Sequence, residues 1–421
     1  MTRASPTPRG LGPPRGNLWT TLGWACYLGS SWTWVIGMFL PVLLVRDYGV
    51  AGWWAFAIPN VIGAAAVGFI WKSATASRRA VRDHRVAMVM FSLVTLALHG
   101  FVIAAWLPVI FGPQWAIAAL GGAIVVALCA ERGPHAVVLA VVATAVSAFA
   151  IAWWNHDLSI WHVEFPYDPP LENRLTNFDL LLAGPGLAIG FLLCPHLDLT
   201  LHRARQALRP GAGRWAFLVG FFLVFAAMIS FALLYAPFLR GAFSTRISLV
   251  LSSGLATMLA LHITTQAAFT TGVHVKALSR EWGRCASSAG LLLLLAGVSL
   301  GAWLQLEDVR GDFSLALDAS EIGYRSILVC YALPFPAVVL YFMTPLRRRA
   351  PRQHRLLVTL VVTIAGTPFA LLGFIFCSSL WLLGVFGAVL LGAMGLWLVP
   401  SLKSDRPQPA TLSIDGAKHG V

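Results

Sequence analysis

Charged residues are scarce in this chain of 421 residues. They make up 11% of the sequence, against about 25% in an ordinary soluble domain, while apolar residues make up 58%. The mean hydropathy is +0.76. This composition excludes an ordinary soluble enzyme. Because a bilayer core about 30 Å thick takes about 20 apolar residues per helix, the length provides for about a dozen crossings. The sequence therefore predicts an all-α polytopic membrane protein.

Paired cysteines are also missing. The sequence has 6 cysteines, which lie in or beside apolar runs without any C-x-x-C pair: Cys26, Cys129, Cys194, Cys285, Cys330 and Cys377. This pattern indicates neither a zinc site nor a disulfide framework, and no organic cofactor is expected. The net charge of +13 does not point to nucleic acid, because the basic residues lie between apolar runs and form no single patch.

Catalytic groups within the membrane are lacking as well. No paired carboxylates and no H-E-x-x-H motif occur within the apolar runs, and apart from Asp179, the first residue of the sixth span, Asp198 is the only acid inside any predicted span. We therefore expect that the protein is not an enzyme. Asp198 and His202 are four residues apart and share a helix face, so they could pair or ligate a metal, although local pairing of Asp198 is favoured.

Apolar runs separated by charge predict twelve transmembrane helices. The predicted spans are 18–45, 51–71, 86–111, 114–130, 133–154, 179–199, 213–238, 247–274, 285–305, 324–345, 354–376 and 379–400. The first run is too long for the core of a signal peptide and has no obvious cleavage site, so we expect it to be retained.

The distribution of charge predicts the orientation. With the N-terminus inside, the cytoplasmic segments hold 24 of the 30 Lys and Arg residues, and 11 of the 17 acids fall outside. Both termini are thus expected in the cytoplasm, with the protein integral to the plasma (inner) membrane and in contact with lipid.

Helix-breaking residues recur in the first and sixth predicted spans. The first contains a run from Gly29 to Gly37 with two serines, followed by Pro41; the sixth contains Gly184-Pro185-Gly186 and Cys194-Pro195-His196. If five helices form a repeat, the second repeat begins on the opposite side of the membrane from the first, because five is an odd number of crossings. The second repeat is then inverted, and the sixth span corresponds to the first. Paired interrupted helices are typical of secondary transport sites, although ordinary kinked helices would show the same residues.

The predicted organisation follows from these spans. It comprises a cytoplasmic tail (1–17), a first five-helix repeat (18–154), an extracytoplasmic loop (155–178), a second five-helix repeat (179–345), two accessory helices, 11 and 12 (346–400), and a second cytoplasmic tail (401–421).

Three segments resemble the sodium/solute symporter family in order and spacing. The stretch from Gly29 to Met38, continuing to Trp54, resembles its first core helix and the following turn. Residues 198–215 are similar to the Gln-Arg-x-x-Ala-Ala-Lys segment after its broken sixth helix, and residues 259–266 to its Ala-Ala-x-x-Ser-Thr cation segment. The resemblance covers about residues 20–345.

The resemblance implies a five-plus-five inverted-repeat fold of leucine-transporter type, with a sodium ion between the first and eighth helices. Carried over to this chain, the implied cation ligands are the carbonyl groups of Tyr27, Ser30 and Leu261 and the hydroxyl groups of Thr264 and Thr265. Neutral oxygens suit a hard cation without placing a carboxylate in hydrocarbon, although adjacent threonines also commonly bond their own helix. His262, one turn before these threonines, is more simply explained as a packing histidine than as a proton or solute contact.

The resemblance also implies a solute pocket at the middle of the membrane. Its lining in this chain would be Ser31, Trp34, Asn60, Cys194, Pro195 and His196. Trp34 replaces a residue that is often polar in the family, so the solute is left open. The fifth helix reads Ala140 to Thr144 and lacks the acid that the family often has there.

The sequence thus predicts a cation-coupled secondary transporter that moves a small organic solute by alternating access, with sodium as the coupling ion. The alternative is a transporter-derived membrane sensor or regulatory protein without net transport. The oligomeric state is left open.

Overall fold

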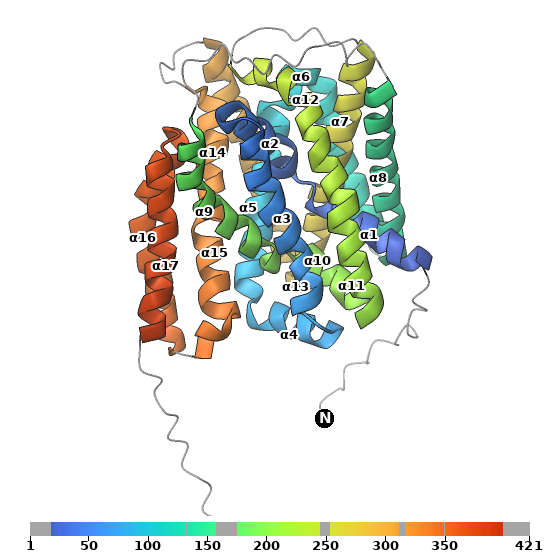
Figure 1. Ribbon diagram of the computed structural model, residues 1–421. Coiled ribbons are helices and arrows are strands. Elements are labelled where there is room, and N and C mark those ends of the chain that lie inside the picture. Colours follow the sequence, from blue (N-terminus) through green and yellow to red (C-terminus); the bar gives the residue numbers. More distant parts are fainter. Residues whose placement is uncertain are drawn as a thin grey trace, which may run out of the picture.

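The protein is a bundle of α-helices that run between two opposite ends of the molecule (Figure 1). The computed structural model describes residues 18–130, 133–156, 175–244, 253–310, 317–348 and 350–398. Within these ranges the chain is almost entirely helical and has no β-strand, which confirms the predicted fold class. The predicted tails, 1–17 and 401–421, and most of the predicted loop, 157–174, lie outside the described residues.

The helices follow one another along the chain with short connections. They are α1 (Leu18–Trp32), α2 (Val35–Tyr48), α3 (Val50–Ile70), α4 (Ala74–Asp83), α5 (Arg85–Ala105), α6 (Leu107–Phe111), α7 (Pro113–Cys129), α8 (Gly133–His156), α9 (Asn177–Leu193), η2 (Cys194–Leu197), α10 (Leu199–Ala207), α11 (Pro210–Val219), η3 (Gly220–Phe225), α12 (Ala226–Ser244), α13 (Ser253–Arg310), α14 (Ala319–Ala332), α15 (Pro334–Val338), η4 (Val339–Met343), η5 (Pro345–Arg348), α16 (Arg352–Ile375) and α17 (Ser379–Leu398).

Membrane-spanning segments occur where the sequence predicts them. In the described part of the chain, 9 helices are long and apolar enough to cross a membrane, and the bent pair α1 and α2 makes a tenth. The apolar helix α7 is shorter, and α13 divides at Gly283, whose φ of 73° marks a sharp turn between two helices. Each of the twelve predicted spans overlaps one of these segments.

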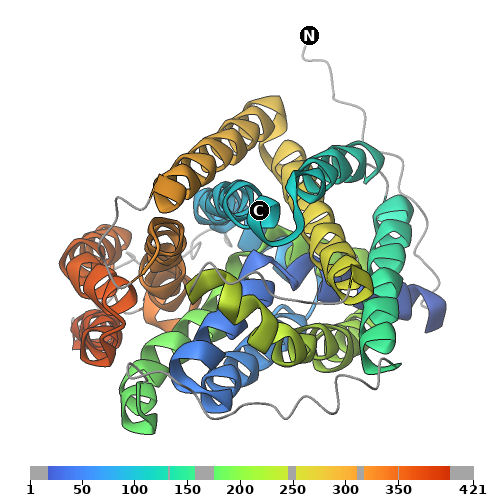
Figure 2. The same cartoon turned by 90° about the horizontal axis from the view of Figure 1, so that it is seen from above.

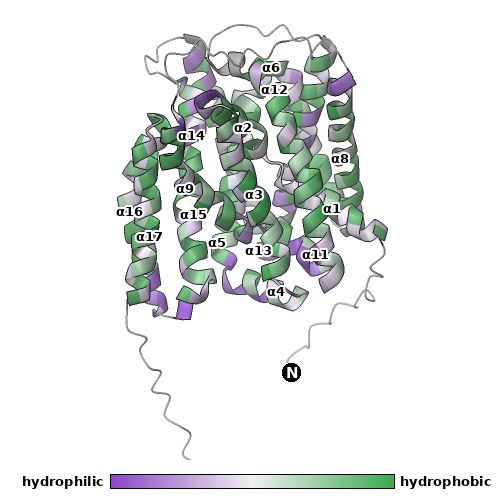
Figure 3. Ribbon diagram, in the orientation of Figure 1, coloured by the Kyte–Doolittle hydropathy of each residue, from purple (hydrophilic) through white to green (hydrophobic). Residues whose placement is uncertain are grey.

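Apolar side chains cover the outer faces of the bundle, and polar residues gather toward its two ends (Figure 3). Large apolar residues are exposed on peripheral helices, among them Leu128, Leu292, Leu360 and Leu391. In water such a surface would be unfavourable, whereas lipid tails solvate it well. The outer surface therefore suits a bilayer.

The first span is interrupted, as predicted. α1 ends at Trp32, Thr33 and Trp34 are not helical, and α2 continues at an angle of 58° to α1. The Trp34 amide donates to the carbonyl of Trp32, so it does not close the helical bond to Ser30. The break therefore frees the main-chain carbonyl of Ser30 in the interior of the bundle.

The sixth span is interrupted too. α9 passes into the 3-10 turn η2, which contains Pro195, and Asp198 then has an extended conformation with ψ 114°. Asp198 caps the next helix, α10, because its Oδ1 accepts a hydrogen bond of 2.6 Å from the amide of Thr200. Both interruptions thus come from residues that weaken a helix locally.

Glycines allow close packing of the helices. The small-residue run of α3 brings Gly63 against the backbone of α9 at Phe191 and Gly68 against the ring of Phe217 in α11. The tightest approach joins α5 to the second part of α13, where Gly100, Gly297 and Gly301 leave no room for a Cβ atom beside the facing carbonyls. These contacts fix the spacing of the bundle.

α16 and α17 lie together at one edge of the bundle when it is viewed along its axis (Figure 2). They contact α9 and α14 from the outside. This placement suits helices that are accessory to the centre, while the division of the other ten spans into two inverted repeats stays a prediction.

Candidate functional site

The two interruptions meet around an aromatic cluster in the interior. Trp34, in the break of the first span, packs edge-to-face on Phe91 of α5 and Tyr331 of α14, with ring centroids 5.2 and 5.7 Å apart. The sixth span reaches the same cluster, because Cys194 Sγ donates to the carbonyl of Tyr331 at 3.3 Å. Four segments distant in sequence therefore converge at the two breaks.

Three residues predicted to line the solute pocket belong to the first break or contact it. Ser31 is buried and donates to the carbonyl of Leu28, and its own carbonyl accepts the Trp34 indole N–H at 2.8 Å. Asn60 of α3 accepts the indole N–H of Trp32 through Oδ1 at 2.7 Å. Asn60 thus ties the third helix to the end of α1.

The three predicted pocket residues of η2 do not all contact the same part of the protein. Cys194 faces Tyr331, whereas the ring of His196 packs on Trp71 at 6.3 Å, toward the end of the molecule that carries α4. Pro195 is buried between them in the turn. The structure thus brings Cys194 to the aromatic cluster and takes the ring of His196 away from it.

The predicted cation ligands of the first helix lie at its break. Ser30 is fully buried, and its hydroxyl lies 3.0 Å from that of Thr144 in α8. Its carbonyl oxygen, freed by the break, accepts a hydrogen bond of 3.1 Å from the hydroxyl of Thr270 in α13. Tyr27 is buried one turn earlier against Phe269.

The predicted cation ligands of the eighth span lie elsewhere on that helix. Leu261, Thr264 and Thr265 precede Thr270 by five to nine residues, which at 1.5 Å per residue is about 8–14 Å along the axis. At this level α13 faces α8, where Nδ1 of His262 lies 2.9 Å from the Ser147 hydroxyl. The threonine next to the break is instead Thr270, whereas Thr271, which follows it, donates to the carbonyl of Ala267 in its own helix.

A buried polar group that the sequence analysis did not assemble lies beside Trp34. Asp198, His274 of α13 and His99 of α5 are all fully buried, and the His274 ring packs against Trp34 at 5.7 Å. The only signal in the sequence was that ionisable residues inside spans are commonly functional. Asp198 does not pair with His202, whose Nδ1 instead lies 2.8 Å from the Ser77 hydroxyl.

A second charged site closes one end of the bundle. Arg46 and Asp47, at the end of α2, form a cluster of four ion-paired residues with Glu321 and Arg325 of α14. Arg46 binds Glu321 through both terminal nitrogens at 2.6 and 2.8 Å. The two positive and two negative charges balance within a nearly buried group.

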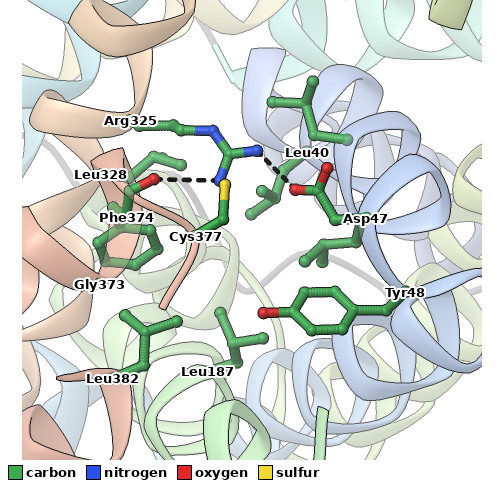
Figure 4. Close-up of a pocket in the computed structure, with 12 residues that line it drawn as sticks. Leu40, Asp47, Tyr48, Leu187, Arg325, Leu328, Gly373, Phe374, Cys377 and Leu382 are labelled. Carbon is green, nitrogen blue, oxygen red and sulfur yellow. Dashed lines mark hydrogen bonds and ion pairs between the residues drawn. The ribbon is translucent and has the colours of Figure 1, made fainter. Parts of the chain in front are cut away.

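A small pocket borders this charge cluster (Figure 4). Arg325 reaches across it to Asp47 at 2.5 Å and to the carbonyl of Phe374 in α16 at 3.2 Å. Leucines and the thiol of Cys377 form most of the remaining wall. Since the pocket is narrow and apolar beyond the ion pairs, the cluster joins α2, α14 and α16 rather than forming a solute site.

The described residues contain no group of three or more His, Cys, Asp or Glu side chains arranged to hold a metal ion. All six cysteines lie in the described ranges, and each is free. The ionisable groups of the described interior are thus mainly the four-residue ion-pair cluster and the group of Asp198, His274 and His99.

Comparison with known proteins gives a likeness of structure but none of sequence. No protein-family model matches this chain, and no curated protein matches it. Its structure is similar to that of Mhp1, a nucleobase-cation-symport-1 family transporter, in a closed conformation with bromovinylhydantoin bound. The TM-score is 0.51, with 14% identity, over 89% of this chain and 92% of Mhp1.

This likeness is one of fold. At 14% identity it shows that the two chains share their overall fold, and it does not single out the sodium/solute symporter family that the sequence resembles. Mhp1 itself is a transporter.

Proposed function

We propose that this protein is a cation-coupled secondary transporter that moves a small organic solute by alternating access. The observation that carries the proposal is the meeting of two interrupted spans at one buried cluster, where freed backbone groups are available to bind a solute and an ion. The similarity to the fold of Mhp1, a cation symporter, is consistent with it.

For the cation we propose a site between the break of the first span and α13. Its ligands would be the carbonyl of Ser30 and the hydroxyls of Thr270 and Thr271, in place of Thr264 and Thr265. The supporting geometry is the freed carbonyl of Ser30, which already lies 3.1 Å from Thr270. Neutral oxygens of this kind suit sodium, which requires several of them.

Thr144 is a further candidate at this site. Its hydroxyl lies 3.0 Å from the Ser30 hydroxyl and approaches from α8, the fifth predicted span. The cation would thus contact three spans and would favour the conformation in which they are packed together. The carbonyls of Tyr27 and Leu261 stay predictions.

For the solute we propose the space between the two breaks, beside Trp34, Tyr331 and Phe91. Aromatic side chains there provide an apolar wall, and Ser31, Asn60 and Cys194 provide polar groups near its edges. Such a lining suits a small solute with both an apolar or planar part and a few hydrogen-bonding groups.

One sodium ion would be sufficient as the driving force. Its entry down an inside-negative membrane potential of about 100 mV releases about 2.3 kcal/mol, and a tenfold inward concentration gradient adds about 1.4 kcal/mol. Together these support an accumulation of roughly a few hundred-fold.

The proposal is tested by thermal-shift screening of solute classes in sodium and in potassium buffer, followed by uptake of the stabilising solute into proteoliposomes. We expect Thr270→Ala with Thr271→Ala to lower sodium-dependent uptake by at least about tenfold, because hydroxyl ligands are lost. The matched control is Thr264→Ala with Thr265→Ala on the same helix, which should keep most of the uptake.

Equal effects of the two double variants would contradict the assigned site. Solute binding without accumulation under any imposed gradient would contradict transport, and would favour the sensor that the sequence left as the alternative.

A further inference from the structure

The break of the sixth span holds a carboxylate with an incomplete set of partners. Asp198 is fully buried, and its Oδ1 accepts the hydrogen bond from Thr200. Its Oδ2 has no hydrogen-bond partner among the described residues. A lone carboxylate in a membrane interior is costly, so this group needs a proton or a nearby positive charge.

The partner that the structure offers is His274. Its Nε2 lies 3.8 Å from Oδ2 of Asp198, and both side chains are fully buried. That separation is too long for a hydrogen bond, and Nε2 has no other partner among the described side chains. The ring is held in place by Trp34 and by the Ser92 hydroxyl, which lies 3.3 Å from Nδ1.

His99 extends this group toward α5. Its ring centroid lies 6.5 Å from that of His274, and its Nδ1 lies 2.7 Å from the carbonyl of Thr95. A carbonyl only accepts, so Nδ1 of His99 must carry a proton, and Nε2 of the neutral ring is an unpartnered acceptor. His99 can therefore take up a further proton at Nε2.

In the described part of the chain, no other ionisable group forms an ion pair with Asp198. His202 and Arg203 of α10 bond to Ser77 and to the carbonyl of Ala130, respectively. The remaining groups from the packed elements are the phenols of Tyr27 on α1 and Tyr331 on α14, the imidazole of His196, and the thiols of Cys194 and Cys330. Within the described residues, His274 is thus the ion-pair partner of Asp198.

We propose that Asp198 and His274 form a proton-binding pair in the break of the sixth span, with His99 as the adjacent proton acceptor. The pair is electrically neutral when it holds one proton, either as carboxylic acid beside imidazole or as carboxylate beside imidazolium. Loss of that proton leaves a net negative charge, which the closed protein cannot solvate. Proton release therefore requires either opening of the break to water or a cation beside it.

This inference rests on the proposed transport function only in its last step, in which the proton moves as the broken helices rearrange. The pair lies beside Trp34, so movement of the first break against the sixth would change its surroundings. The protonation itself can be measured without any solute or transport assay.

The first experiment measures the charge of both groups in purified protein in lipid nanodiscs, from about pH 5 to about pH 9. Infrared difference spectra report the carbonyl stretch of an un-ionised Asp198, assigned by its loss in Asp198→Asn. Nuclear magnetic resonance of ¹⁵N-histidine reports the state of His274, assigned by its loss in His274→Gln. At about pH 7 we expect one of the two protonated forms.

Single variants of the pair should shift in predictable directions. In His274→Gln, Asp198 loses its potential cation and should stay a carboxylic acid to a pH at least about one unit higher. In Asp198→Asn, the carboxylate that would stabilise a protonated His274 is gone. His274 should therefore be neutral over a wider range of pH. The control is His262→Gln, which removes another fully buried histidine, whose Nδ1 bonds Ser147 and whose Nε2 has no partner, and it should leave both signals unchanged.

Detection of ionised Asp198 together with neutral His274 at about pH 7 would overturn the proposal. If Asp198→Asn fails to fold, the shift of the acid signal in His274→Gln decides the question alone.

A second experiment addresses the link to transport, with a pH gradient imposed across proteoliposomes in the absence of a sodium gradient. Uptake driven in the wild type and lost in Asp198→Asn supports coupling, whereas uptake insensitive to the gradient in both overturns it. A complete lack of flux would contradict the proposed transport function. The proton-binding pair would then be tested by the spectroscopic measurements alone.

Discussion

At the scale of single residues, the densest charge inside the protein is the cluster of Arg46, Asp47, Glu321 and Arg325. Glu321 is the residue most dependent on its neighbours, since it accepts from both arginines and its side chain is 2% exposed. Isolated ion pairs on a surface contribute little, but the loss of one partner from a buried group leaves an uncompensated charge. The cluster should therefore be sensitive to any single neutralisation.

We expect Glu321→Gln to lower the free energy of unfolding by about 3–5 kcal/mol, because two buried arginines would then share one carboxylate. The measurement is the unfolding midpoint in detergent micelles. Arg82→Gln serves as the control, since the Arg82–Asp83 pair is 75% and 42% exposed and should contribute nothing measurable. A midpoint for Glu321→Gln that matches this control would show that the cluster does not hold α2 to α14.

The residues of the candidate site were only partly predictable from the sequence. Helix-weakening residues correctly located the break of the first span and the break at Cys194-Pro195-His196 in the sixth, because their effect on a helix is local. The other predicted interruption, Gly184-Pro185-Gly186, was wrong, because it lies inside the continuous helix α9. The choice between Thr264-Thr265 and Thr270-Thr271 depends on how far α13 is shifted along its axis relative to α1. Two threonine pairs six residues apart on one apolar helix look alike in sequence, so only packing distinguishes them.

The group formed by Asp198, His274 and His99 was beyond sequence reasoning for a related reason. Its members come from three spans, and each alone resembles an ordinary buried polar residue. Only the depth and rotation of each helix bring Nε2 of His274 toward Asp198. Long-range contacts of this kind carry no local pattern.

At the scale of helices, the contact between α5 and the second part of α13 depends on the absence of side chains. A Cβ at Gly297 would meet the carbonyl of Ala97, and backbone cannot yield as a flexible side chain can. In a membrane this close packing is the main source of helix association, because lipid is as apolar as leucine.

Gly297→Ala should therefore lower the unfolding midpoint, with a loss of about 1–3 kcal/mol from overpacking. Gly121→Ala in α7 is the matched control, because nothing lies within 4 Å of a Cβ built there. This control should be neutral or slightly stabilising, since alanine favours helix over glycine. Equal destabilisation by the two variants would show that α5 and α13 can move apart enough to accommodate the added methyl group.

At the scale of the whole molecule, the two ends of the bundle carry different charge. The end with α4 and the start of α5 holds a group of basic residues, among them Arg78, Arg79, Arg82 and Arg85. The opposite end holds acids such as Glu307 and Asp308 close to the end of α13. Basic residues are retained on the cytoplasmic side of inner membranes, so the α4 end should be cytoplasmic, with the termini.

Cysteine labelling tests this orientation in intact cells, in a background without the native cysteines. Arg82 and His156 are both exposed but lie at opposite ends, in the last turn of α4 and at the end of α8. A membrane-impermeant maleimide should label His156→Cys in intact cells and Arg82→Cys only after the cells are opened. The reverse labelling pattern would show that the protein has the opposite orientation in the membrane. The cluster around Arg46 would then face the cytoplasm, but inward sodium movement could still drive uptake, because the membrane potential and the sodium gradient, and not the orientation of the carrier, set the direction of coupled transport.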